Sequence, residues 1–191
     1  MKKLLPLIAC LVLGACSGIP LASVPRILAL KADLLEANPA EIMLAIQVDE
    51  RIAPARGDVP VLHIDIRPRE VGAFAPWEGK MPMRLSAGAA PKGLQPAARG
   101  RHWLVYSLGP ESQAELLRTR ARFQQLQAER RGKSGGSVSV GIAQEGVAAA
   151  SPHVAGSVWE SWLQTSAQAG FFKLWSGTLD DLRAQARAGS P

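Results

Sequence analysis

Residues 42–49 read IMLAIQVD, and residues 62–67 read LHIDIR. In both segments every second residue is a large apolar one, which is the period of a β-strand that buries one face. The segment between them, 54–60, contains two prolines, a glycine and an aspartate and is typical of a loop. The pattern therefore predicts two strands that pair with each other in an antiparallel sheet.

Strand and helix patterns continue through the rest of the chain. The longest predicted helix covers residues 110–131, which start with Pro-Glu and carry a narrow apolar stripe of Leu116, Thr119, Phe123 and Leu126. Shorter helical segments are predicted at 24–37 and 178–186. Further strands are predicted at 81–86, 102–108, 137–143, 158–165 and 171–176, the last two as a hairpin. Because the order lacks βαβ regularity, we expect an α+β fold, with an antiparallel β-sheet or sandwich covered by one long helix and a short N-terminal helix.

The N-terminus has the order of a secretory signal peptide. Lys2 and Lys3 precede an apolar run at 4–13, which is too short to cross a bilayer, since a spanning helix needs about 20 apolar residues. The run ends in the small residues Gly14 and Ala15, followed by Cys16. Residues 1–15 are therefore predicted to be removed from the mature protein.

The motif Leu13-Gly14-Ala15-Cys16 resembles the lipobox of bacterial prolipoproteins. This resemblance implies that a lipoprotein signal peptidase recognises Leu13, Gly14 and Ala15. It also implies that Cys16 becomes the first residue and carries a covalent diacylglycerol and an N-acyl chain, with no other cofactor expected. A second match ends at Cys10, but it would leave an apolar core of residues 4–9 only, below the roughly 7 residues that a signal peptide needs.

The same resemblance implies a location. Residue 17 is serine, not the aspartate that typically retains such lipoproteins at the inner membrane, so we expect attachment to the outer membrane, facing the periplasm. The predicted organisation is a signal peptide at 1–15, a lipidated tether at 16–23, a single domain at 24–186 and a flexible tail at 187–191. The domain is similar in general character to uncharacterised proteobacterial lipoproteins and, more loosely, to sandwich-type lipoproteins of secretion machines.

Composition excludes several classes of function. Removal of Cys10 and acylation of Cys16 leave the mature chain without a free thiol, so thiol nucleophiles, disulfides and thiolate metal sites are not expected. The net charge of +6, of which Lys2 and Lys3 supply two, is a mild excess. The arginines of the long helix, Arg118, Arg120 and Arg122, lack interleaved aromatic residues for base stacking. They are interpreted as a solvated face, and no nucleic-acid partner is expected.

One pair of residues resembles a catalytic unit. His63 and Asp65 lie two residues apart and therefore on the same face of a strand, where a histidine and a carboxylate can act together on a ligand. A metal site is not predicted, because His102 and His153 have no spacing that adds them to the pair. A polar, solvated strand face is the favoured interpretation, since one-sided sheets show such alternation anyway.

Aromatic residues concentrate in the last predicted hairpin. Strand alternation places Trp159 and Trp162 on opposite faces, and it does the same for Phe171 and Phe172. These four residues and Trp175 form a candidate docking patch for a protein or lipid partner, because one set can enter the core while the other remains outside. The alternative, that helices and loops cover both faces of the hairpin, remains open at this point.

These observations lead to one functional prediction and two alternatives. We expect a non-enzymatic, lipid-anchored module that binds another envelope protein through the C-terminal hairpin or an edge of the sheet. The first alternative is a carrier that encloses an apolar ligand between the sheet and the long helix. The second is a periplasmic hydrolase that uses His63 and Asp65.

Overall fold

The computed structural model describes residues 30, 34–54, 57–86, 91, 93–129, 136–150, 154 and 156–189. The lipobox, Cys16 and most of the helix predicted at 24–37 lie outside these residues. Of that helix the structure describes Leu30 and residues 34–36, which are helical, and the side chains of Leu30 and Leu34 are buried. A short 3-10 helix, η2 (Pro39–Glu41), follows, and the Asn38 side chain caps it by accepting from the backbone N–H of Ala40.

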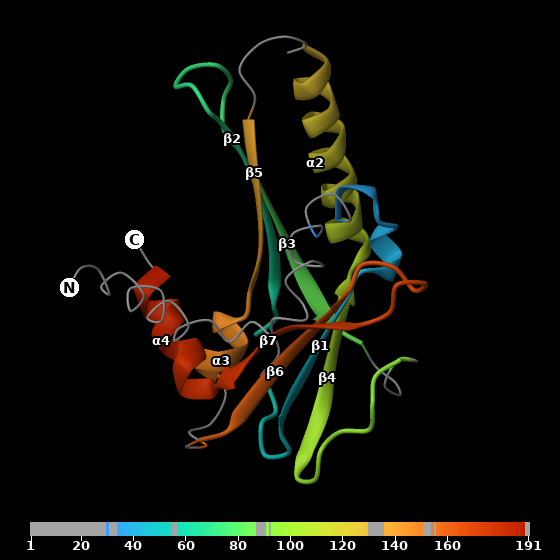
Figure 1. Cartoon of the computed structure of the whole chain (residues 1–191), viewed down its shortest axis with the longest axis vertical. Coiled ribbons are helices and arrows are strands. Elements are labelled where there is room, and N and C mark those ends of the chain that lie inside the picture. Colours follow the sequence, from blue (N-terminus) through green and yellow to red (C-terminus); the bar gives the residue numbers. More distant parts are fainter. Residues whose placement is uncertain are drawn as a thin grey trace, which may run out of the picture.

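Seven antiparallel strands form one curled sheet (Figure 1). In chain order they are β1 (Met43–Asp49), β2 (Val61–Pro68), β3 (Trp77–Leu85), β4 (Arg101–Leu108), β5 (Gly136–Ala143), β6 (Val158–Gln164) and β7 (Phe172–Thr178). In space the order is β5-β2-β3-β4-β1-β6-β7. The helices α2 (Pro110–Glu129), α3 (Glu145–Ala150) and α4 (Leu179–Gly189) complete the described part of the chain. The prediction of an α+β fold with an antiparallel sheet is confirmed.

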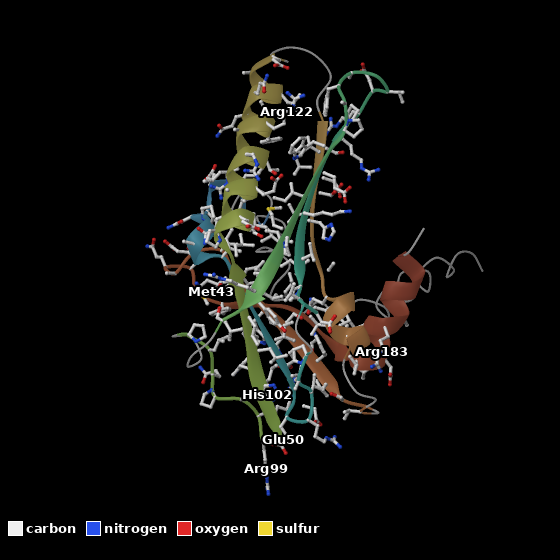
Figure 2. All side chains as sticks on the ribbon, turned by 180° about the vertical axis from the view of Figure 1, so that it is seen from behind. Met43, Glu50, Arg99, His102, Arg122 and Arg183 are labelled. Carbon is white, nitrogen blue, oxygen red and sulfur yellow. The ribbon has the colours of Figure 1, made fainter. Side chains whose placement is uncertain are left out.

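Strand β3 joins the two halves of the sheet. Its residues 77–82 pair with β2, whereas residues 83–85 pair with β4. Pro82 lies where the partner changes, and its carbonyl accepts a 2.7 Å hydrogen bond from the Ser112 hydroxyl in the first turn of α2. The helix thereby satisfies a carbonyl at the junction of the two halves. Figure 2 shows the two ends of the elongated molecule, with Arg122 of α2 near one end and Arg99, just before β4, at the other.

The predicted pairing of β1 with β2 is wrong. β1 pairs with β4 and β6, and β2 pairs with β3 and β5. The predicted alternation is confirmed for β2, where Leu62, Ile64 and Ile66 are buried and the residues between them are not. It is wrong for β1, where Ala45 and Gln47 are buried as well. Both strands point their large apolar side chains to the same concave face. Alternation therefore identifies which side chains enter the core, but it predicts neither the neighbouring strand nor whether the other face is covered.

A single buried cluster fills the concave face of the sheet. Helix α2 runs along β3 and contributes Leu116 and Leu126 to this cluster, as predicted from its apolar stripe. The helix approaches β3 closely at Gly79, where an added Cβ would lie 2.8 Å from the Thr119 hydroxyl oxygen. Helices α3 and α4 pack against each other near β7 (Figure 1), where Leu179 anchors α4 in the same cluster.

Several boundaries differ from the predicted ones. β3 starts at Trp77, four residues before the predicted strand, and α3 was not predicted at all. α4 continues to Gly189 and thus into the residues predicted as a tail. No helix within the described residues is both long enough and apolar enough to cross a membrane.

Candidate functional site

The aromatic residues of the C-terminal hairpin divide between the two faces of the sheet. Trp159 is fully buried, and Phe172 is 9% exposed. Trp162, Phe171 and Trp175 are partly exposed, although Trp175 packs against the core and its ring covers Gly177. The predicted separation of Trp159 from Trp162 is therefore confirmed, but the five residues of the candidate patch do not form one surface.

Trp162 instead meets a tryptophan from another strand on the convex face. Its ring centroid lies 6.3 Å from that of Trp103 in β4, with an interplanar angle of 81°, which is the favourable edge-to-face geometry. β1 runs between the two strands and places the small Ala45 opposite Trp162. The Trp103 indole N–H donates to the Gln95 carbonyl at 3.0 Å, whereas the Trp162 indole nitrogen is buried without a hydrogen-bond partner among the described residues.

Three charged residues surround this pair. Lys173 Nζ lies 5.1 Å from the ring centroid of Trp162, a cation–π contact, and 2.8 Å from Glu160 Oε1. Glu160 Oε2 lies 3.8 Å from Nη1 of Arg101. The Arg101 guanidinium also donates to two backbone carbonyls, at 2.6 and 3.1 Å, and burial lowers its pKa.

We call these five residues, Arg101, Trp103, Glu160, Trp162 and Lys173, the Trp103–Trp162 surface. Its charges are paired with one another, so the surface has the features of a fixed contact area and not those of a proton-transfer site. The sequence did not indicate a role for Trp103, which lies in a segment, 102–108, predicted only to be a strand. Its position opposite a second tryptophan depends on the insertion of β1 between β4 and β6.

His63 and Asp65 lie on the convex face of β2, as the alternation predicted. The adjacent strand β5 places Gly141 opposite His63 and Ser139 opposite Asp65. His63, Asp65 and residues 139–143 line a hollow of about 390 Å3, which we call the convex hollow.

The geometry of the convex hollow is not that of an activated nucleophile. His63 Nδ1 lies 3.9 Å from Glu78 Oε1, and Asp65 Oδ1 lies 4.0 Å from Nη2 of Arg67. Glu78 is held by Lys80 at 2.8 Å, and this hydrogen bond lowers the pKa of the Glu78 carboxyl group. Within the described residues neither His63 nor Asp65 forms a hydrogen bond with Ser139, a bond that nucleophilic catalysis would use.

A second hollow lies between α2 and β5 on the concave face. It has a volume of about 410 Å3 and is lined by Leu35, Glu36, Arg120, Phe123, Gln124, Gln127 and Val138. We call it the concave hollow. Three of its lining residues are apolar, and Phe123 and Val138 contribute apolar walls from the helix and the strand.

Arg120, at the wall of the concave hollow, is not part of a solvated face as predicted. Its Nη2 donates to the carbonyl of Leu34 at 2.9 Å and also to the carbonyl of Ala37. Burial lowers the pKa of Arg120, because the charged form is partly removed from water. The side chain thus ties α2 to the segment that precedes η2.

No group of three or more potential metal ligands occurs among the described residues. Comparisons of the chain with models of protein families, with curated proteins and with solved structures found no match.

Proposed function

We propose that this protein is a bacterial envelope lipoprotein, held at the outer membrane by acylated Cys16, that acts as a non-enzymatic binding module for another envelope protein. The observation that carries the proposal is the order of Lys2 and Lys3, the apolar run 4–13 and the motif that ends at Cys16. Each buried methylene contributes about 0.8 kcal/mol, so several acyl chains hold the protein at a bilayer durably, whereas one chain binds it only marginally.

Labelling with radioactive palmitate in intact bacteria tests the anchor. The wild-type chain should incorporate label and sediment with membranes. Cys16→Ser should abolish both labelling and cleavage of the signal peptide, while the matched variant Cys10→Ser should behave as wild type. Label that persists in Cys16→Ser, or a wild-type chain that takes up none, would contradict the anchor.

The binding role is supported by the Trp103–Trp162 surface, where aromatic rings and paired charges gather on the convex face. In-cell cross-linking followed by mass spectrometry tests it. Trp162→Ala should lose the cross-links to a partner, whereas the control Leu117→Ala, at an exposed position of α2, should keep them. Identical partner lists for wild type and Trp162→Ala would remove this surface from the proposal.

A carrier of an apolar ligand is the second candidate, because the concave hollow falls within the size range of ligand sites. The lining of the concave hollow argues against an apolar ligand, because four of its residues are polar or charged: Glu36, Arg120, Gln124 and Gln127. Saturable binding of a fluorescent fatty acid that Phe123→Ala weakens would favour the carrier. Absence of such binding, together with loss of partner cross-links in Trp162→Ala, would favour the binding module.

A further inference from the structure

Strand β5 is an unprotected edge of the sheet. It pairs with β2 over eight residues without a register shift, and within the described part of the chain it has no second neighbour. Its sequence, GSVSVGIA, contains no charged residue and no proline. Exposed edges are normally protected by charges, prolines, bulges or a covering element, because a free edge pairs readily with other strands.

The opposite edge of the same sheet is protected. The pairing of β7 with β6 contains an irregularity between Ser161 and Trp162, and β7 carries Lys173. Helix α4 follows directly and packs against β7. Among the described residues, the usual protective devices are thus found at the β7 edge and not at the β5 edge.

The two hollows lie on either side of β5. The concave hollow includes Val138, and the convex hollow includes Ser139 and Gly141, whose positions alternate with that of Val138 along the strand. Successive side chains of a strand point to opposite faces. A strand added to β5 would therefore place alternate side chains in the two hollows, which is how β-strand addition combines backbone hydrogen bonds with side-chain specificity.

The two hollows favour different side chains. Phe123 and Val138 provide apolar walls on the concave side, and both side chains are partly buried against the core cluster. On the convex side the Asp65 side chain is 29% exposed, and its Oδ1 lies 4.0 Å from Nη2 of Arg67, too far for a hydrogen bond. An apolar side chain thus fits the first hollow, and a lysine or arginine fits the second.

A second copy of this chain fits less well. Its own β5 would offer the convex hollow only Ser137, Ser139, Gly141 and Ala143, whose side chains are small and carry no charge for Asp65. We therefore propose that β5 accepts, by β-strand addition, an extended segment of another protein in which apolar residues alternate with lysine or arginine. This inference rests on the proposed binding role and adds to it a second contact surface, separate from the Trp103–Trp162 surface, together with a partner chemistry.

Peptide selection tests the inference without a bilayer. Random peptides displayed on phage are selected on the detergent-solubilised full chain, and the selected peptides are synthesised. We expect apolar residues alternating with lysine or arginine, and slower hydrogen exchange at β5 when the peptide binds. N-methylation of the peptide backbone at alternate positions should abolish binding for one set of positions and spare the other, because only every second amide faces the partner strand.

Two protein variants locate the peptide. Gly141→Leu should weaken binding about tenfold or more, because a Cβ at this position meets open space and the added side chain occupies the convex hollow. The control Ser176→Leu on β7 should change affinity less than about twofold. Asp65→Asn should weaken a selected peptide but not its analogue with alanine in place of lysine or arginine.

Three results would overturn the inference. These are a selection without any peptide that protects β5, peptides that are indifferent to the position of N-methylation, and a wild-type dimer that Gly141→Leu converts to a monomer. The last result would assign the edge to a second copy. Because peptide binding is measured in detergent, its failure leaves the palmitate experiment unaffected, and loss of labelling at Cys16 would not alter peptide binding.

Discussion

Gln144 Oε1 accepts a hydrogen bond of 3.0 Å from the indole N–H of Trp159, and both side chains are buried. The same oxygen accepts a second bond, of 2.6 Å, from the Ser161 hydroxyl. Gln144 directly follows β5, whereas its two partners lie in β6, at the far side of the strand order. One side-chain amide therefore links the end of β5, in the half of the sheet that contains β2, to β6 in the half that contains β1 and β4.

Replacement of this amide should be costly. Gln144→Leu leaves two buried donors without an acceptor, so we expect the free energy of unfolding to fall by about 2 to 4 kcal/mol. Urea unfolding followed by tryptophan fluorescence measures the loss. Gln125→Leu, at an exposed position of α2, should change stability by less than about 0.5 kcal/mol. Equal stability of the two variants would contradict the role of Gln144.

Gly79 should tolerate no side chain while Thr119 is present. Gly79→Ala brings a Cβ to within 2.8 Å of the Thr119 hydroxyl oxygen, and the resulting displacement should cost about 1 to 3 kcal/mol. In the double variant with Thr119→Ala this cost should largely disappear, which a double-mutant cycle of thermal unfolding measures. Gly141→Ala, which meets open space, is the control. Additive effects of the two substitutions would refute the steric explanation.

Arg120 should contribute more to stability than its neighbours on α2. Arg120→Met keeps the aliphatic bulk but removes the bonds to the carbonyls of Leu34 and Ala37, so a loss of about 2 kcal/mol is expected. Arg118→Met removes only an exposed pair with Glu115 and should cost no more than about 0.5 kcal/mol. Chemical unfolding of both variants tests this order, and a reversed order would be inconsistent with it.

Tyr106 should make the fold sensitive to alkaline pH. Its buried hydroxyl lacks a hydrogen-bond partner among the described residues, and burial raises its pKa to about 12. Between pH 10 and 12 the unfolded chain ionises this group while the folded chain does not. Stability should therefore fall with rising pH across this window, by up to roughly 2 to 3 kcal/mol.

The chain contains one tyrosine, so phenolate absorbance reports Tyr106 alone. We expect little phenolate in the folded protein at pH 10 to 11 and a normal titration near pH 10 after unfolding in urea. Tyr106→Phe should fold with similar stability at neutral pH and lose stability less steeply above pH 10. A midpoint near pH 10 in the folded protein would disprove the effect of burial.

Local patterns predicted the elements better than their neighbours. The buried faces of β1 and β2 and the apolar stripe of α2 followed from residues a few positions apart, where periodicity is informative. The strands that pair with β1 could not be predicted in this way, because Met43 pairs with Ser107 and Gln164, which are far away in the sequence. Residues 77–80 of β3 escaped prediction because Gly79 interrupts the strand pattern there, although its missing side chain makes room for Thr119 of α2.

The candidate sites show the same limit. Alternation correctly placed His63 and Asp65 on one face and separated Trp159 from Trp162. It could not bring Trp103 to Trp162, because that contact requires a third strand with a small residue, Ala45, between them. The presence of a hollow on each side of β5 likewise could not be predicted. The concave hollow requires α2 to lie beside β5, and the strand patterns contain no information on the position of this helix.

The central position of β1 has a consequence for how the polypeptide acquires its structure. β1 is the first strand of the chain, yet one of its neighbours, β6, is among the last to be synthesised. In a polypeptide that emerges amino end first, one side of β1 must remain unpaired until the chain has emerged as far as β6, Val158–Gln164. Pairing between segments so far apart in the sequence slows folding. While β1 remains unpaired its apolar side chains are exposed and prone to aggregation, and a chaperone that binds β1 at this stage would prevent that.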